Sequence, residues 1–259
     1  DYVTEGGHTS HKQAGATWIQ RWLPDARWQQ VVLTAGAQHG LLVAISSLSK
    51  SDDVVLCESL CYPGIISLAH SLGRRLRGVA MDEHGLIPEA LRAACLEHRP
   101  SLLVCVTTHQ NPTNSIMPAE RREAIAQIAR EFDVFIVDDD IYGFLQPDPQ
   151  HKPISAYAPE RSIYLTSLSK SILPALRIGY LYSPPRLLSR PMEDYSRHLI
   201  ASRRVRARTL MRAPIGTPLL EIQGLDVVYR DRDRLLRRRP PVAALADVSL
   251  TLRRGEALA

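Results

Sequence analysis

A lysine surrounded by hydroxyl residues is the feature of this sequence with the clearest chemistry. Lys170 follows an apolar run, residues 163–165, that predicts a short buried strand. Poor solvation at the end of such a strand lowers the pKa of an amine and makes it a nucleophile. The hydroxyls of Ser167 and Ser169 and the fixed charge of Arg177 suit a phosphate group. An amine beside a phosphate site is what a pyridoxal phosphate (PLP) Schiff base requires, and the alternative is an ordinary exposed loop lysine.

Three earlier segments also place small or polar residues after a predicted strand. Gly36 opens a turn that leads into a helix, where free backbone N–H groups and the helix dipole favour an anion. Tyr62 is delivered to a sheet edge, where its ring either stacks on a flat cofactor or packs against a loop. Asn111, held extended by the following proline, either presents its amide to a ligand or closes an Asx turn.

Three consecutive carboxylates follow the apolar run 134–137. Asp138, Asp139 and Asp140 indicate either a divalent metal or a single acid with a special role. The metal interpretation requires partner ligands that the sequence does not identify.

Short, unbroken apolar runs alternate with helical segments along residues 13–182. This alternation predicts an α/β domain with a mostly parallel sheet. The loops after successive strands then lie at one edge of the sheet, where such folds bind ligands. The predicted strands are 31–34, 53–56, 79–81, 102–106, 134–137, 163–165 and 178–182, and the predicted helices are 13–22, 41–48, 65–72, 88–96 and 119–132.

Length and composition limit the classes of protein to consider. The chain has 259 residues, of which 45% are hydrophobic and 23% charged, enough for one large domain or one and a piece. It contains no apolar run that could cross a membrane and no signal peptide, and without an initiator methionine we expect it to begin inside a longer protein. Its four cysteines lack metal-type spacing and predict reduced thiols of a cytoplasmic protein; they are Cys57, Cys61, Cys95 and Cys105.

The net charge of +5 is unevenly distributed. Residues 197–259 contain fourteen arginines and six acidic residues, whereas acidic residues are in excess before them. A basic surface over the whole protein would indicate nucleic acid binding, but basicity confined to the end predicts a domain boundary instead.

The ordered motifs resemble those of class I/II PLP-dependent aminotransferases of fold type I. Residues 109–113, residues 117–122 and the seven-residue spacing from Lys170 to Arg177 are most similar to the aminotransferase domain of MocR-type regulators. The resemblance covers about residues 1–215. It implies a three-layer α/β/α PLP-transferase large domain that forms a homodimer. The motifs that carry it are Thr34-Ala35-Gly36-Ala37-Gln38, Asn111-Pro112-Thr113, Asp139-Asp140-Ile141-Tyr142, Ser167-Leu168-Ser169-Lys170 and Arg177-Ile178-Gly179-Tyr180.

The resemblance also implies a role for each motif around the cofactor ring. Lys170 would form the Schiff base and later move the proton of the substrate. Asp139 would pair with the pyridinium nitrogen and keep the ring protonated, so that the ring stabilises a carbanion. Asn111 and Tyr142 would hydrogen-bond the ring hydroxyl oxygen, and Tyr62 would stack on the ring.

The implied reaction is the transfer of an amino group between an amino acid and a 2-oxo acid. Asp138 and Asp140 are expected to be solvated or capping neighbours. The residues implied to hold the cofactor phosphate are Gly36, Ala37, Gln38, Ser167, Ser169 and Arg177.

The sequence departs from the family pattern in two places. Asn114 stands where the motif usually has glycine, and because asparagine tolerates a left-handed backbone we expect the turn to survive. No segment after Tyr182 matches the family's small domain. We therefore expect a truncated large domain whose activity is impaired.

The last 44 residues, 216–259, resemble the first strands of an ABC transporter ATP-binding subunit. Residues 218–229 alternate like a strand, residues 230–239 predict a charged exposed loop, and residues 244–256 predict a further strand pair. The chain ends before any P-loop. The alternative is an arginine-rich linker that contains β-like stretches.

Three functions follow from these resemblances. The first is an aminotransferase. The second is a PLP-sensing domain of a MocR/GntR-type transcription regulator, in which nucleic acid would be bound only by an upstream domain that this chain lacks. The third is an ATP-binding transport component.

Overall fold

The computed structural model describes residues 6–146, 148, 151–188, 218–229 and 242–253. The chain divides into two compact units, residues 1–203 and 204–259, each of which is described by itself. Residues 189–217 lie outside the described ranges, so the expected domain boundary at residues 215–216 stays a prediction.

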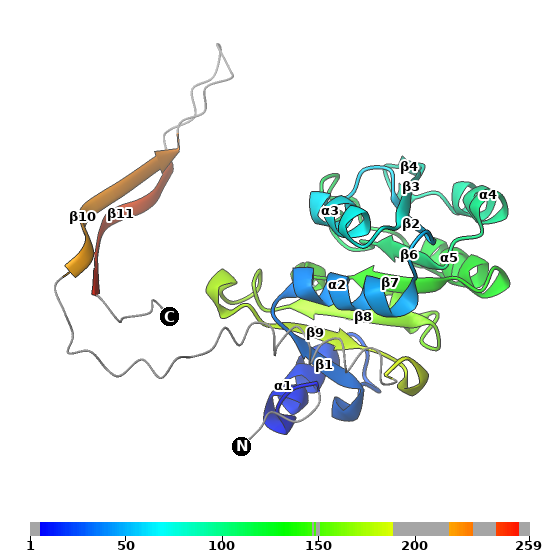
Figure 1. The fold of residues 1–259 in the computed structure, drawn as a ribbon, viewed down its shortest axis with the longest axis horizontal. Helices are drawn as coiled ribbons and strands as arrows, with labels where there is room; N and C mark the ends of the chain where they lie inside the picture. The colour runs from blue at the N-terminus through cyan, green and yellow to red at the C-terminus, as the bar shows by residue number, and fades with distance from the viewer. Residues whose placement is uncertain (1–5, 147, 149–150, 189–217, 230–241, 254–259) are drawn as a thin grey trace, which may run out of the picture. The chain divides into compact units, whose positions relative to one another are not determined.

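A seven-stranded sheet is the scaffold of the first unit. Its strands are β1 (Val31–Thr34), β2 (Val54–Glu58), β3 (Arg75–Val79), β6 (Leu102–Cys105), β7 (Phe135–Asp139), β8 (Ser162–Ser167) and β9 (Gly179–Tyr182). The order is β1-β9-β8-β7-β6-β2-β3, and Figure 1 shows the strands in this order from bottom to top. Neighbours from β3 to β8 are parallel, whereas β9 is antiparallel to both β8 and β1. The prediction of an α/β fold with a mostly parallel sheet is confirmed.

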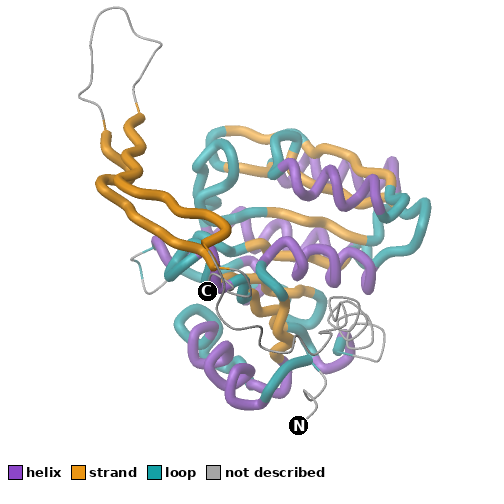
Figure 2. Tube along the Cα trace, turned by 60° about the vertical axis from the view of Figure 1, so that its left-hand side comes forward, coloured by secondary structure: helices purple, strands orange, loops and turns teal. Residues whose placement is uncertain are grey.

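Helices cover both faces of this sheet, as the purple and orange segments of Figure 2 show. They are α1 (Thr9–Ile19), α2 (Ala37–Leu48), α3 (Pro63–Ser71), α4 (Pro88–His98) and α5 (Ala119–Glu131). Successive strand residues point to opposite faces. Val55 and Val104 accordingly pack with α2 and α3, whereas Leu56 and Leu103 pack with α4 and α5.

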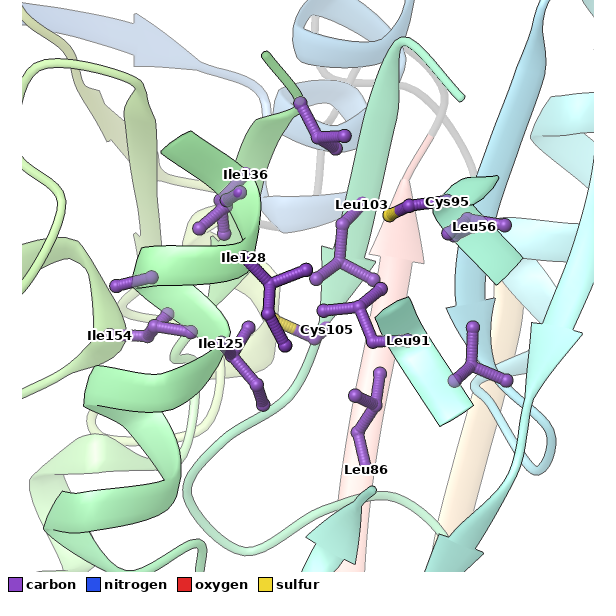
Figure 3. Packing of buried hydrophobic residues seen from close by; sticks show 14 of the residues in the cluster. Leu56, Leu86, Leu91, Cys95, Leu103, Cys105, Ile125, Ile128, Ile136 and Ile154 are labelled. Carbon is purple, nitrogen blue, oxygen red and sulfur yellow. The ribbon is translucent and has the colours of Figure 1, made fainter. Parts of the chain in front are cut away.

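The second of these two cores shows how the layers are joined. Leu91 of α4 and Ile125 and Ile128 of α5 pack against Leu103 and Ile136 of the sheet (Figure 3). Each of these side chains is at most 4% exposed. Burial of one such side chain contributes roughly 1.5–3 kcal/mol, so this packing holds the strand ends in fixed positions.

The predicted strand at residues 79–81 proved to be two elements. β3 ends at Val79, and β4 (Met81–Asp82) pairs with β5 (Gly85–Leu86) in a separate two-stranded sheet. β3 is an edge strand of the seven-stranded sheet, most of its residues are exposed, and two of them, Arg75 and Arg77, are charged. An apolar pattern therefore does not detect it.

The second unit contains two described strands, β10 (Pro218–Tyr229) and β11 (Val242–Arg253), which form one antiparallel pair. The strand expected at residues 218–229 is present. The expectation of a strand pair within residues 244–256 is wrong, because these residues up to Arg253 form one continuous strand that pairs with β10. The expected loop at residues 230–239 lies outside the described residues. In the described ranges, no helix is both long and apolar enough to cross a membrane.

Candidate active site

The topology of the sheet brings distant segments to one edge. β1, β2, β6, β7 and β8 run in the same direction, so the segments that follow them meet at the edge where these strands end. β9 runs the opposite way, so the segment that precedes it reaches the same edge. A pocket there is lined by Ala37, Gln38, Leu41, Tyr62, Val106, Asn111, Asp139, Ile141, Tyr142, Ser167, Ser169, Lys170 and Arg177.

All the residues predicted for the site except Gly36 line this pocket. The prediction missed Leu41, Val106 and Ile141. Val106 ends the apolar run 102–106, so its place at the sheet edge could have been derived from the sequence. Leu41 lies one turn into α2, and only the packing of that helix brings it to the pocket.

The N-terminus of α2 and an arginine form one end of the pocket. Gly36 is the N-cap of α2 and has a φ of 84°, a conformation that favours glycine. A Cβ at Gly36 would stand 2.8 Å from Nη2 of Arg177, so the guanidinium lies against the helix N-terminus. At Gly179 a Cβ would stand 2.8 Å from the carbonyl carbon of Gly36, so β9 also approaches this turn closely. Free N–H groups beside a guanidinium make an anion site.

Two serine hydroxyls belong to the same end. Ser167 Oγ donates a hydrogen bond to the carbonyl of Ile178 at 2.9 Å and accepts one from the backbone N–H of Ser169 at 3.2 Å. Ser169 Oγ is buried and has no hydrogen-bond partner among the described residues. A buried hydroxyl without a partner beside Arg177 fits a phosphate oxygen.

Asp139 lies in the pocket wall at the end of β7 and is 3% exposed. Burial, and then the neighbouring charge of Asp138, raises the pKa of its carboxyl to about 7. In the described part of the chain, its buried Oδ1 has no hydrogen-bond partner. A cationic N–H donor would both satisfy this oxygen and stabilise the ionised carboxylate.

The other two carboxylates of this run have different surroundings from those expected. Asp138 accepts hydrogen bonds from the backbone N–H (2.9 Å) and Oγ (2.8 Å) of Ser155, and Asp140 accepts one from the hydroxyl of Tyr164 at 2.9 Å. Both carboxylates are buried. The expectation that they are solvated is wrong, because both are at most 1% exposed, whereas Asp138 does cap a backbone N–H in the 3-10 helix Ile154–Ala156. Among the described residues, no group of His, Cys, Asp or Glu side chains is placed to hold a metal ion.

Lys170 both lines the pocket and is exposed. The expectation of a poorly solvated amine is therefore wrong for this chain, because the lysine stands three residues beyond the end of β8, outside the buried sheet.

Tyr62 is 37% exposed, and its ring lies over Gly64 and next to Gln38. A Cβ added to Gly64 would overlap this ring and would stand 2.5 Å from Gln38 Oε1.

The loop that carries Asn111 is closed by its own side chains. Gln110 Nε2 donates to the carbonyl of Leu60 at 2.6 Å, which ties this loop to the Tyr62 turn. Asn114 has a φ of 61° and its Oδ1 lies 3.0 Å from Nδ1 of His109. The prediction that asparagine preserves the left-handed turn is confirmed.

A buried arginine anchors both ends of this loop. The side chain of Arg122 in α5 donates to the carbonyls of Thr107 (2.7 Å), Met117 (2.9 Å) and Lys152 (2.9 Å). Sequence patterns did not identify it, since it stands among other charged residues on an amphipathic helix. It is 1% exposed, and burial lowers the pKa of its guanidinium.

A second buried acid at the sheet edge was also missed. Glu58 ends β2, is fully buried, and accepts a hydrogen bond from the backbone N–H of Val106 at 3.0 Å. Burial raises the pKa of Glu58 to about 8. The sequence feature that could have identified Glu58 is an acidic residue directly after the apolar run 54–57.

Comparison with known proteins decides the family. The family model of aminotransferase class I and II matches residues 1–239. The chain belongs to the class I and II aminotransferases. The match extends into residues 216–239, part of the segment that resembles an ABC transporter subunit, and that second resemblance stays a prediction.

The aminotransferase relatives include both enzymes and regulators. The chain is 28% identical to the uncharacterized HTH-type transcriptional regulator YdeF of Bacillus subtilis over 183 residues, which cover 71% of this chain and 39% of YdeF. It is 29% identical to the mitochondrial kynurenine/alpha-aminoadipate aminotransferase of Mus musculus over 178 residues, 64% of this chain and 42% of that enzyme. The chain therefore spans about two fifths of the length of these curated relatives.

A solved aminotransferase structure shares the fold. The kynurenine aminotransferase of Pyrococcus horikoshii, solved in complex with PMP, has a TM-score of 0.70 and 25% identity. The similarity covers 77% of this chain and 51% of that one.

Pyridoxal 5'-phosphate is the cofactor of this aminotransferase family, and the pocket fits it. The unpartnered oxygen of Asp139 suits the pyridinium N–H. At the other end, the N-terminus of α2, Ser169 and Arg177 suit the phosphate. Lys170 lines the same pocket.

Proposed function

We propose that this chain is the cofactor-binding large domain of an enzyme that transfers an amino group between an amino acid and a 2-oxo acid. The observation that carries this proposal is that Lys170, Asp139 and Arg177, from three different strand ends, line one pocket. An amine, a buried acid and a phosphate site are the three groups that PLP chemistry requires of a protein.

Each of these residues has a defined task. PLP, when bound, supplies a ring that withdraws electrons from the substrate Cα. Arg177, Ser169 and the N-terminus of α2 hold the phosphate and so fix the position of the ring. Asp139 holds the proton at the pyridine nitrogen, and its burial strengthens this ion pair. Lys170 binds the cofactor covalently through Nζ and moves the proton at the substrate Cα.

The side chains around the ring orient it. Asn111 and Tyr142, which line the pocket, would donate hydrogen bonds to the ring hydroxyl oxygen, and Tyr62 would cover one face of the ring. Lys170 is exposed in this chain. Bound cofactor and substrate would exclude water from it.

Absorption spectroscopy and mass spectrometry test this proposal. The purified chain is mixed with PLP, dialysed, reduced with borohydride and digested. We expect a visible absorption band that survives dialysis, and a pyridoxyl label on Lys170. The variant Lys170→Ala should lose both, and Lys152→Ala is the matched control that should keep both. A label spread over many lysines, or none, contradicts the proposal.

A PLP sensor in a regulator is the second candidate, favoured by the similarity to YdeF. Adding an amino acid and a 2-oxo acid separates the two functions. Many turnovers per protein molecule support the enzyme, whereas a spectral change without turnover supports the sensor.

The location and assembly of the protein belong to the same proposal. All four cysteines are free thiols, which fits a reducing compartment such as the cytoplasm. A homodimer is supported by exposed apolar side chains at or near the pocket residues Tyr62, Lys170 and Arg177 in the sequence. They are Leu60, Tyr62, Ile66, Ile172, Leu173 and Leu176.

A further inference from the structure

Two cysteines meet next to the pocket but are not part of it. Cys57 lies in β2 and Cys61 in the turn that follows, and their sulfurs are 3.7 Å apart. Cys57 is buried, whereas Cys61 is partly exposed. The sulfur of Cys61 is therefore open to a small oxidant, and the buried sulfur of Cys57 already lies close to the sulfur of Cys61. A disulfide has an S–S length of about 2.05 Å, so a displacement of less than about 2 Å would join them.

We propose that Cys57 and Cys61 form a reversible disulfide when hydrogen peroxide oxidises them, and that this bond withdraws Tyr62 from the cofactor pocket. The first half of the proposal is independent of any cofactor. The consequence for PLP rests on the proposed function.

The structure indicates which sulfur moves. Cys57 is held in the sheet on both sides, because β2 pairs there with Gly78 of β3 and Val104 of β6. Cys61 lies in a short turn outside the sheet, so closing the bond displaces that turn. Tyr62 follows Cys61 directly and is the N-cap of α3, so its ring moves with the turn.

The two cysteines also differ in acidity, as disulfide formation through one thiolate and one thiol requires. The thiol of Cys57 donates its hydrogen bond to Cys61. This bond lowers the pKa of Cys61 to about 7, and the same bond together with burial raises the pKa of Cys57. Cys61 is thus the thiolate near neutral pH and Cys57 the proton donor.

The oxidation balances without a further reactant. The Cys61 thiolate attacks one peroxide oxygen, the O–O bond breaks, and the leaving hydroxide takes up a proton to become water, which gives a sulfenic acid at Cys61. The sulfur of Cys57 then attacks the sulfur of Cys61, the S–O bond breaks, and the hydroxide leaves as water with the proton of Cys57. Two thiols lose two electrons and two protons in total, and one peroxide becomes two waters.

The experiment compares reduced and peroxide-treated full chain. Mass spectrometry should show a Cys57–Cys61 cross-link and the loss of two hydrogen atoms, both reversed by dithiothreitol. Hydrogen exchange of residues 59–66 should speed up on oxidation. PLP affinity should fall about fivefold, because one ring stack contributes that much to binding. Cys61→Ser, which changes a partly exposed residue, should abolish all three effects, and Cys95→Ser should leave them intact.

The outcomes are separable. If the reduced chain binds PLP but peroxide yields no cross-link, the inference is overturned and the proposed function stands. A cross-link without faster exchange at residues 59–66, or without weaker PLP binding, overturns the displacement of Tyr62. If the reduced chain binds no PLP, the proposed function fails, and the cross-link and exchange results decide the disulfide inference by themselves.

Discussion

The guanidinium of Arg177 lies against the Cα of Gly36, where a Cβ would stand 2.8 Å from Nη2. These residues are far apart in the sequence, but β1 and β9 are antiparallel neighbours, so the end of one strand adjoins the start of the other. The contact places a permanent positive charge at the N-terminus of α2. A phosphate group bound there would meet both.

Replacing Gly36 with alanine should therefore weaken PLP binding by about tenfold or more, because the new methyl group strains the turn and displaces Arg177. Titration of the absorption band with PLP measures the affinity. Gly73→Ala is a matched control, since Gly73 also has a positive φ (68°) but lies in the turn between α3 and β3. Both variants should lose roughly 1–2 kcal/mol of unfolding free energy. Equal PLP affinity in the two variants would contradict this account of the phosphate site.

Asp139→Asn should have opposite effects on the stability of the cofactor-free chain near pH 8 and on PLP affinity. Burial, followed by the charge of Asp138, raises the pKa of Asp139 from 3.8 to about 7, so the folded chain holds this proton more tightly than the unfolded chain. The contribution of this carboxyl to stability is then greatest at low pH and falls as the pH rises from about 4 to 7. The cofactor-free variant should gain ~2 kcal/mol over the wild type between pH 5 and pH 8, while its PLP affinity falls.

Denaturant unfolding of the cofactor-free proteins at the two pH values measures this gain. Asp133→Asn changes a carboxyl whose side chain is 90% exposed, so its difference from the wild type should stay constant between pH 5 and pH 8. An Asp139→Asn variant that loses stability relative to the wild type on going to pH 8 would falsify the assignment of a raised pKa.

Two adjacent arginines should differ sharply in their effect on stability. Arg122→Met should cost ~3 kcal/mol of unfolding free energy, because two buried carbonyl groups and one partly buried carbonyl group lose their donor. Arg121→Met removes an ion pair with Asp82 whose side chains are 18% and 30% exposed, and a 3.4 Å hydrogen bond to the carbonyl of Gly85, and should cost about 1 kcal/mol or less. Chemical denaturation compares the two variants. Because Arg122 anchors the loop of Asn111, its variant should also bind PLP more weakly, and similar costs for both arginines would refute that anchoring role.

Leu173→Asp should disrupt the proposed homodimer. Leu173 is 48% exposed in the loop between Lys170 and Arg177. Together with the exposed Ile172 and Leu176 it forms an apolar surface to which a second copy of the chain could bind. Sedimentation velocity should show a dimer for the wild type and a shift toward monomer for the variant. Leu96→Asp alters a more exposed leucine, 66%, on α4 and should leave the dimer intact. A monomeric wild type, or dissociation of both variants, would rule out this surface.

Local sequence patterns were sufficient to predict the sheet and most of the pocket. An apolar run followed by Tyr62, Asn111, Asp139 or Lys170 marks the end of a buried strand, and parallel strands end at one edge. Strand ends therefore predict which residues converge without any knowledge of the contacts between them. The edge strand β3 escaped this pattern because it is exposed and charged.

Contacts between distant segments decided the remaining features of the site. The burial of Asp138 and Asp140 depends on Ser155 and Tyr164, and that of Arg122 on carbonyl groups of two loops. Such partners leave no periodic signal, because each is a single contact whose desolvation and hydrogen bonding exist only once the chain has packed. The sequence by itself thus determined which residues gather at the sheet edge, and the tertiary structure alone decided which of them are buried, paired or exposed.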